Sequence, residues 1–341
     1  GIDIIRGEAK ITSKNTITVE NRSIEGKNII IATGSYPKGF EFNVPKENLM
    51  ELEHMYDMEE LPSSVAVVGQ GPVAVEMAQF FSMINKEVTL VSPSKNLIPF
   101  ADQYINDYIY NRLKKDKVNM IFEDSIKEYK DGVLYVKDQE VKCEKVLNAA
   151  MRGPILPDMD INIELEGGFV RTDQHLKTNY DNIYAVGDVN GKSFLAHAGS
   201  AQGLFAINNI KGIKGEIKLH NYPLNIYTSP EIAQIGLTEQ ELQSENIEYK
   251  VSEFPLSANG KALIEGYKDG NVRMLSEKKY GEVLGVQIIA PHATDMIAEA
   301  AAFMQIESTV YDVTKVIHAH PTISEVFMEA GFDAVDKAIH K

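Results

Sequence analysis

Two histidines and a carboxylate lie close together near the end of the chain, in the segment His318-Ala319-His320-Pro321-Thr322-Ile323-Ser324-Glu325. Proline is well tolerated as a first helical residue, and the pattern predicts that a helix follows over residues 326–338. A histidine just before a helix and an acid in its opening turns can face one another. The acid then fixes the tautomer of the imidazole and raises the basicity of its other nitrogen. This spacing is that of a general base.

Three interpretations of this segment stay open on spacing alone. His320 with Glu325 could act as a base. The histidines could instead be structural, because Glu325 near a helix N-terminus is favoured by the helix dipole alone. His318 and His320 could also ligate a metal ion, although no third ligand follows at a recognisable spacing.

Length, charge and cysteine usage narrow the class of protein. A chain of 341 residues with 44% hydrophobic content should hold two or three domains. Its net charge of -15 argues against binding to nucleic acid or to anionic membrane surfaces. No apolar run is long enough to span a bilayer, and no signal peptide is visible. The one cysteine, Cys143, rules out a disulfide scaffold and an internal disulfide, and it indicates the cytoplasm.

A glycine-rich turn forms the clearest local unit, in Gly69-Gln70-Gly71-Pro72-Val73-Ala74. A strand, a helix and a second strand are expected around it at residues 65–68, 73–84 and 87–91. In this context Gly69 makes the tight turn, Gly71 lets a pyrophosphate reach the backbone, and Ala74 keeps helix and strand close. The helix N-terminus attracts the phosphates. The pattern predicts dinucleotide binding, and the alternative is a tight turn with no ligand.

The end of the second strand departs from the dinucleotide fingerprint. An acid is expected there to bond the ribose 2′-hydroxyl, but the position is Ser92, followed by Pro93, Ser94 and Lys95. No arginine stands there to bind a 2′-phosphate. These residues therefore do not choose between NAD and NADP.

Two further apolar strands end in residues suited to ligand contact. The strand expected at residues 28–32 ends in Thr33-Gly34, where small side chains allow close approach to the backbone. Residues 183–186 end in Gly187-Asp188, and an acid at the carboxyl end of a buried strand lies where α/β sheets bind ligands. The alternative is that Asp188 caps the next turn. His197, just before a helix expected at residues 199–210, is structural when taken alone.

The rest of the pattern predicts an α/β part followed by a separate α+β domain. In the first part, strands are expected at residues 2–5, 9–11, 16–20, 118–122, 126–129, 133–136 and 141–149, with a helix at 103–114. In the second part, strands of an antiparallel sheet are expected at residues 225–227, 232–235, 249–254, 271–275 and 283–289. Helices are expected with them at residues 238–243, 294–305, 310–316 and 326–338.

Together these motifs resemble the pyridine nucleotide-disulfide oxidoreductase family, and within it the dihydrolipoamide branch. The matching residues are Ala32-Thr33-Gly34, Gly69-x-Gly71-x-x-Ala74-x-Glu76, Arg152-x-Pro154, Tyr184 to Asp188, Leu195-Ala196-His197, Tyr227-Thr228-Ser229-Pro230-Glu231, Gly285-Val286-Gln287 and His318 to Glu325. They cover essentially the whole chain. Ala319-His320 before Pro321 looks more like the lipoamide than the glutathione branch, and a mercuric reductase would carry cysteines near its C-terminus.

The resemblance implies an α/β fold of Rossmann-like nucleotide-binding domains followed by a C-terminal α+β dimerisation domain. Its boundaries would place an incomplete FAD-binding domain at residues 1–44 and 153–216. The NAD(P)-binding domain would span 45–152 and the dimerisation domain 217–341. A homodimer is expected, in which His320 serves the active site of the opposite subunit.

The resemblance also implies a role for each motif. The residues expected to line NAD are Gly69, Gly71, Ala74 and Glu76, with Ser92 at the ribose position. The residues expected to contact FAD are Thr33, Gly34, Gly187 and Asp188, together with Ala196 and His197 in the segment that follows. His320 would be the proton-transferring base, oriented by Glu325, and the His320-Pro321 peptide bond is expected to be cis.

The activity implied is oxidation of dihydrolipoamide, carried by a lipoyl domain of a 2-oxoacid dehydrogenase or related complex. Electrons would pass through a cysteine pair and FAD to NAD⁺. The family's glycine-rich FAD turn and Cys-x-x-x-x-Cys pair are not in this sequence, and we therefore expect a truncated chain. Met151 also stands where a glycine usually precedes the arginine. The alternatives are a non-catalytic nucleotide-binding and dimerisation module, or a glutathione- or mercuric-reductase-like enzyme of the same family.

Overall fold

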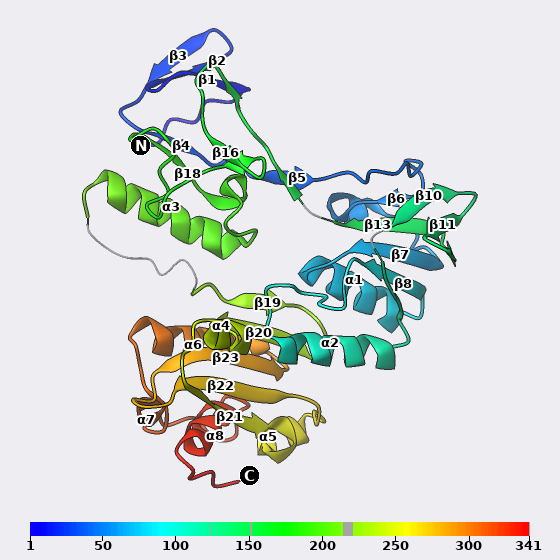
Figure 1. The fold of residues 1–341 in the computed structure, drawn as a ribbon, viewed down its shortest axis with the longest axis vertical. Coiled ribbons are helices and arrows are strands. Elements are labelled where there is room, and N and C mark those ends of the chain that lie inside the picture. The colour runs from blue at the N-terminus through cyan, green and yellow to red at the C-terminus, as the bar shows by residue number, and fades with distance from the viewer. Residues whose placement is uncertain (124, 151, 214–220, 341) are drawn as a thin grey trace. The chain divides into compact units, whose positions relative to one another are not determined.

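The structure is a computed structural model that describes residues 1–123, 125–150, 152–213 and 221–340, without the side chains of residues 54, 56 and 57. The chain divides into two compact units (Figure 1). Unit 1 comprises Gly1–Lys38 and Met151–Leu219, and unit 2 comprises Gly39–Ala150 and His220–Lys341. The three-domain division expected from the sequence stays a prediction. The expected domain boundary between residues 216 and 217 lies outside the described residues. So does Met151, which stands where the family usually has a glycine.

A parallel pair of strands forms the centre of unit 1. β4 (Ile29–Ile31) pairs in register with β18 (Ile183–Ala185). Alternate residues of the pair enter two different apolar clusters, and one of these clusters contains Phe205 of the helix α3 (Ala196–Ile210). Both faces are therefore covered, as is typical of parallel strands.

Short sheets complete unit 1. A four-stranded sheet has the order β15-β1-β2-β3, over Asp158–Met159, Ala9–Ser13, Thr16–Val19 and Arg22–Glu25. Two two-stranded sheets pair β5 with β14 and β16 with β17, over Ser35–Pro37, Arg152–Pro154, Leu165–Glu166 and Phe169–Val170. A 3₁₀ helix, Gly187–Asn190, follows β18.

A five-stranded parallel sheet carries the glycine-rich turn in unit 2. Its order is β6-β13-β7-β8-β9, over Leu49–Met50, Lys145–Ala149, Ser64–Gly69, Glu87–Ser92 and Asn119–Phe122. Val65 and Val67 of β7 pack with helices α1 (Pro72–Met83) and α2 (Gln103–Lys115). Ala66 and Val68 pack on the other side, with the sheet β10-β11-β12 at Ile126–Lys130, Val133–Val136 and Gln139–Lys142. A short 3₁₀ helix, Leu52–Asp57, follows β6.

An antiparallel sheet forms the C-terminal part of unit 2 (Figure 1). Its order is β19-β20-β23-β22-β21, over Leu224–Ile226, Glu231–Gly236, Val283–Ala290, Asn271–Glu277 and Tyr249–Pro255. The large apolar cluster on one face includes helices α6, α7 and α8, at Ala293–Gln305, Val310–Val313 and Glu325–Ala334. On the other face Ile226, Ile232 and Ile289 join the cluster that contains α1 and α2. The short helices α4 (Glu239–Ser244) and α5 (Gly260–Ile264), and the 3₁₀ helix Leu256–Ala258, complete this part.

A buried carboxylate links the two parts of unit 2. Asp102 caps α2 through the N–H of Tyr104 and is 1% exposed. Its carboxylate also accepts hydrogen bonds from the N–H of Glu239, the first residue of α4 (2.7 Å), and from Nε2 of Gln287 in β23 of the antiparallel sheet (3.1 Å). Its own N–H donates to Gln234 Oε1 at 2.8 Å. Buried charge is stable only when it is hydrogen-bonded in this way.

Several expected elements differ from the structure. No strand forms at residues 2–5, where Ile2 and Ile4 are 92% and 82% exposed and no sheet covers them. The single strand expected at residues 141–149 is two strands, because β12 pairs with β11 whereas β13 pairs with β7. The helix α3 begins three residues early, at Ala196, and α7 ends at Val313 instead of residue 316.

The last helix is also shorter than expected. α8 ends at Ala334 instead of residue 338, and Asp336 then has a φ of 59°, which is incompatible with a continuing right-handed helix. The elements β3 and α5 had not been predicted. None of the helices in the described part of the chain is both long and apolar enough to cross a membrane.

Candidate functional site

The turn between β7 and α1 leaves the backbone open at the helix N-terminus. Gly71, the N-cap of α1, has a φ of 93°, and no side chain caps the helix. A Cβ at Gly71 would meet no atom within 4 Å. Gly69 (φ 142°) is tightly packed instead, because a Cβ there would lie 2.0 Å from the carbonyl oxygen of Ala149 in β13. The packing of the fold therefore requires glycine at position 69, whereas the open space at Gly71 fits the close approach of a pyrophosphate.

Two other residues of the motif hold α1 in place. Ala74 is fully buried in the cluster between α1 and the sheet. Glu76 Oε1 accepts a hydrogen bond from the N–H of Tyr227 at 2.8 Å. Burial raises the pKa of Glu76, and this hydrogen bond only partly opposes the rise. One turn on, Gln79 bonds both the N–H and the carbonyl of Ser229. Glu76 thus connects the nucleotide helix with the segment Tyr227–Glu231 that follows β19.

Ser92 lies at the carboxyl end of β8, beside the glycine-rich turn. β7 and β8 are parallel neighbours with Val68 opposite Val91. Ser92 is 1% exposed, and its hydroxyl donates to the carbonyl of Ser94 at 3.0 Å. The structure therefore brings Gly69, Gly71 and Ser92 to one edge of the sheet, where dinucleotides bind in this type of fold.

The residues expected at FAD come together within unit 1. Because β4 and β18 are parallel neighbours, Thr33-Gly34 and Gly187-Asp188 end at the same edge, and Val186 N–H donates to Ile31 O at 2.9 Å. Asp188 Oδ2 accepts a hydrogen bond from Ser35 Oγ at 2.5 Å. Ser35 Oγ in turn accepts from Arg152 Nε at 2.7 Å. This chain from Arg152 to Asp188 was not predicted, since Ser35 and Asp188 are 153 residues apart.

Gln202 of α3 adds a buried polar group beside Gly187. Its Oε1 accepts from the N–H of Gly187 and from Asn190 Nδ2, both at 2.8 Å. Its Nε2 is buried and has no hydrogen-bond partner among the described residues. A buried donor without a partner is unusual and fits a bound ligand at this edge. Ala196 and His197 are the first two residues of α3, and both are exposed.

The histidine and the carboxylate of the C-terminal segment face one another. His320 Nδ1 lies 3.0 Å from Glu325 Oε1, and the other carboxylate oxygen accepts from Thr322 N–H at 2.9 Å. Burial alone would raise the pKa of Glu325, but the hydrogen bonds from Thr322 and His320 lower it. The His320 side chain is 80% exposed, so Nε2 is accessible to a substrate. The His320-Pro321 bond is cis, which confirms that prediction.

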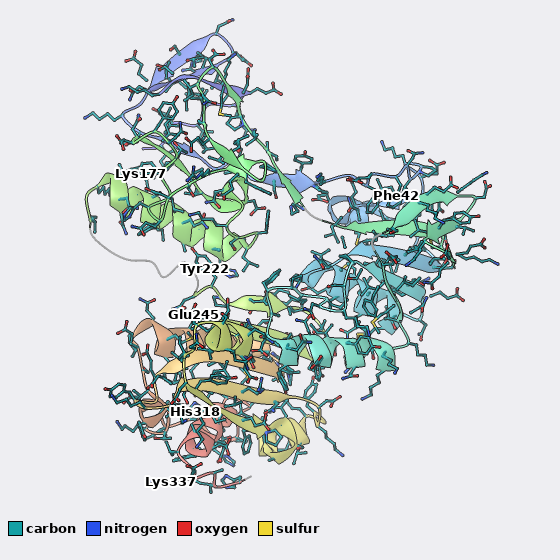
Figure 2. All side chains as sticks on the ribbon, in the orientation of Figure 1. Phe42, Lys177, Tyr222, Glu245, His318 and Lys337 are labelled. Carbon is teal, nitrogen blue, oxygen red and sulfur yellow. The ribbon has the colours of Figure 1, made fainter. Side chains whose placement is uncertain are left out.

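A second histidine–carboxylate pair lies beside the first. His318 Nε2 is 2.7 Å from Glu299 Oε1 of α6, and the His318 side chain is 5% exposed. Figure 2 labels His318 in the C-terminal part of unit 2. The hydrogen bond to Glu299 raises the pKa of His318 although burial opposes it. Each histidine thus has its own carboxylate, and the described residues contain no group of three or more His, Cys, Asp or Glu that could hold a metal ion.

The fold and these sites define a class of protein with two Rossmann-like nucleotide-binding regions and an added interface domain. The pyridine nucleotide-disulphide oxidoreductase family matches residues 1–203, and its dimerisation domain matches residues 222–331. The chain therefore belongs to this family of flavoprotein disulfide oxidoreductases. It has the family's α/β FAD/NAD-binding fold with a dimerisation domain, as the sequence predicted.

Relatives are similar along nearly the whole chain. Dihydrolipoyl dehydrogenase of Bacillus subtilis (strain 168) is 32% identical over 356 residues, which are 99% of this chain and 77% of that protein. Dihydrolipoyl dehydrogenase of Chlamydia trachomatis is 31% identical over 355 residues, or 99% of this chain and 76% of that protein. Mitochondrial dihydrolipoyl dehydrogenase 2 of Arabidopsis thaliana is 30% identical over 359 residues, which are 99% of this chain and 71% of that protein.

Solved structures share the fold at lower identity. LpdA from Mycobacterium tuberculosis superimposes with a TM-score of 0.87 at 22% identity, over 96% of this chain and 75% of that one. The HOCl-induced flavoprotein disulfide reductase RclA from Escherichia coli gives a TM-score of 0.84 at 21% identity, over 95% of this chain and 78% of that one.

Proposed function

We propose that this chain is the nucleotide-binding and base-bearing part of a dihydrolipoyl dehydrogenase. The enzyme oxidises dihydrolipoamide, carried by a lipoyl domain of a 2-oxoacid dehydrogenase or related complex, with NAD⁺ as the final acceptor. The observation that carries the proposal is the His320–Glu325 pair at 3.0 Å, with an 80% exposed imidazole. Relatives named dihydrolipoyl dehydrogenase, similar over 99% of the chain, support the same substrate.

In the proposed reaction, Nε2 of His320 takes the proton of a substrate thiol. The Nδ1–H donates to Glu325, which holds the ring and stabilises the imidazolium that forms. The lowered pKa of Glu325 keeps this carboxylate ionised at neutral pH. The resulting substrate thiolate attacks a protein disulfide. One protein sulfur leaves as a thiolate and can take the proton of the second substrate thiol. That second sulfur then attacks the first substrate sulfur and displaces the protein sulfur bound to it, so that lipoamide gains its disulfide and the protein gains a reduced cysteine pair.

The cysteine pair of this exchange would come from residues other than these 341. The sequence holds one cysteine, Cys143, which is buried in unit 2. Burial raises the pKa of its thiol to about 11, so it is protonated and unreactive at neutral pH. FAD, when bound, supplies the two-electron relay between the cysteine pair and the nicotinamide.

Each cofactor would be held by the residues at one sheet edge. Gly69 and Gly71, with Ala74 and Glu76 of α1, would bind NAD, with its ribose near Ser92. FAD would contact Thr33, Gly34, Gly187 and Asp188, together with Ala196 and His197 at the start of α3. The open turn at Gly71 and the unpartnered Nε2 of Gln202 support these assignments.

We propose a homodimer, in which His320 serves the active site of the opposite subunit. Large apolar side chains that precede the segment His318 to Glu325 in the chain are exposed, with Ile317 at 96%, Ile306 at 75% and Tyr311 at 55%. Exposed apolar groups of this size are typical of a surface that another chain covers. They lie within residues 222–331, which match the dimerisation domain.

The test is the visible spectrum of the protein expressed from its complete gene, before and after dihydrolipoamide is added. The proposal expects flavin absorbance that bleaches with dihydrolipoamide and returns with NAD⁺. A colourless protein would favour the non-catalytic module. A flavin that responds to glutathione but not to dihydrolipoamide would assign another substrate within the family.

A further inference from the structure

The adenosine ribose position of the nucleotide site has no acidic side chain. NAD-binding sites of this fold place an acid at the end of the second strand. That acid accepts a hydrogen bond from the ribose 2′-hydroxyl and repels a 2′-phosphate. The residue here is Ser92, which is 1% exposed and donates its hydroxyl to the carbonyl of Ser94. Its side chain therefore neither repels a phosphate nor offers the ribose an ionised acceptor.

A lysine lies on the loop that leaves this strand. Lys95 is exposed, and its Nζ is 6.0 Å from the centre of the Phe122 ring, at the carboxyl end of the neighbouring strand β9. The ammonium group is therefore at the same edge of the sheet as Ser92. A positive charge at this edge attracts a charged 2′-phosphate more strongly than a neutral 2′-hydroxyl.

The carboxylate that follows β9 is already paired with a lysine. Glu123 follows β9, and its N–H donates to the carbonyl of Ser92 at 2.9 Å. Its carboxylate accepts from Lys137 Nζ at 2.9 Å and from Ser125 Oγ at 3.1 Å. Because Glu123 is paired with Lys137, the charge of Lys95 is not cancelled by it.

We propose that the nucleotide site of this chain accepts the 2′-phosphate of NADP(H), with Lys95 as the residue that favours it. This inference rests on the proposed nucleotide binding at the Gly69–Ala74 turn, but not on dihydrolipoamide as the substrate. The enzyme would then use NADP⁺ at least as readily as the NAD⁺ named in the proposed function, at the same site.

The test measures binding of adenosine 2′,5′-bisphosphate and of 5′-AMP by titration calorimetry, using the complete protein. These probes differ only in the 2′-phosphate, and their binding needs neither flavin turnover nor the cysteine pair. The bisphosphate should bind the unmodified protein more tightly than 5′-AMP. Lys95→Ala should weaken the bisphosphate roughly fivefold, the size of one exposed ion pair, and leave 5′-AMP unchanged.

Two further variants test whether the effect depends on a charge at the carboxyl edge of the sheet, or on any change of charge in the protein. Lys86→Ala removes the same charge just before β8, at the opposite edge of the sheet, and should leave the ratio of the two affinities unchanged. Ser92→Asp restores the acid and should reverse the preference, in a protein whose melting temperature shows that it folds.

Two results would overturn the inference. One is tighter binding of 5′-AMP than of the bisphosphate by the unmodified protein. The other is an equal effect of Lys95→Ala and Lys86→Ala on the ratio. If 5′-AMP binds and the bisphosphate does not, the proposed function still stands. Failure of both probes to bind would overturn the nucleotide site itself and this inference with it.

Discussion

Nε2 of His318 lies 2.7 Å from Oε1 of Glu299, so the two histidines of the His-Ala-His segment are held by different carboxylates. Glu299 belongs to α6, and the His318 side chain is 5% exposed. The exposed His320, two residues later, therefore follows a residue that is fixed to the body of the C-terminal domain. The proposed base is anchored on both sides, by Glu299 through His318 and by Glu325 directly.

Replacing Glu299 with Gln should remove a pH-dependent part of the stability. The hydrogen bond from Glu299 raises the pKa of His318, and burial opposes the rise only in part. The pair between His318 and Glu299 therefore stabilises the protein fully below the pKa of histidine in the unfolded chain, about 6.5. This stabilisation is lost as pH rises through the higher pKa of His318 in the folded protein. As pH rises above about 6.5, the unmodified protein should therefore lose more stability in thermal unfolding than Glu299→Gln. If the stability of the two proteins changed with pH in parallel, the pair between Glu299 and His318 would not contribute the predicted pH-dependent stability.

Glu325→Gln should slow dihydrolipoamide oxidation about 100-fold, at the lower end of what general base catalysis contributes. The amide oxygen can still accept from Thr322 N–H, so the segment keeps its shape while the imidazolium loses its counter-charge. Glu329→Gln is the matched control, because Glu329 forms a similar pair with His340, at 2.6 Å. Steady-state rates should stay within about twofold for that control. Equal losses in the two variants would contradict the assignment.

Gly69→Ala and Gly71→Ala should separate folding from nucleotide binding. A methyl group at Gly69 would lie 2.0 Å from a backbone carbonyl oxygen, and we expect a loss of about 3 kcal/mol or more in urea unfolding. At Gly71 the methyl group meets no atom, so only the positive φ costs about 1–2 kcal/mol. Gly71→Ala should therefore fold and fail to bind the dinucleotide. Normal nucleotide binding by this folded variant would count against the turn as the site.

Asp102→Ala should destabilise unit 2 strongly, by roughly 3–5 kcal/mol. The substitution removes the cap of α2 and leaves Glu239 N–H and Gln287 Nε2 without their acceptor. Asp102→Asn keeps one oxygen in place and should lose about half as much. Urea unfolding of both variants checks the order. A loss below about 1 kcal/mol for Asp102→Ala would mean that the buried carboxylate is not needed.

The sequence predicted elements well where periodicity and turn chemistry agree. The unit from β7 to β8 formed within one or two residues of the predicted bounds, because β7 is an almost continuous apolar run and the glycines after it mark the turn. The facing of His320 and Glu325 was also predictable, since the two residues are close along the chain. The strand expected at residues 2–5 was wrong because an apolar run predicts a strand only when another strand pairs with it.

Contacts that depend on tertiary packing could not be predicted. Glu299 reaches His318 from a different helix, and Gln287 reaches Asp102 across 185 residues. The chain from Arg152 through Ser35 to Asp188 requires the pairing of β5 with β14. No local pattern of residue types predicts these partners. They nevertheless hold in place the residues that the sequence motifs predict.

The most direct test of the central claim, that His320 is the proton-accepting base, is stopped-flow reduction of the bound flavin in His320→Gln. The account predicts that reduction by dihydrolipoamide falls by about 10²- to 10⁴-fold. Reduction of the same variant by the nicotinamide cofactor needs no substrate proton and should stay close to the rate of the unmodified protein. Unchanged reduction by dihydrolipoamide would contradict the account.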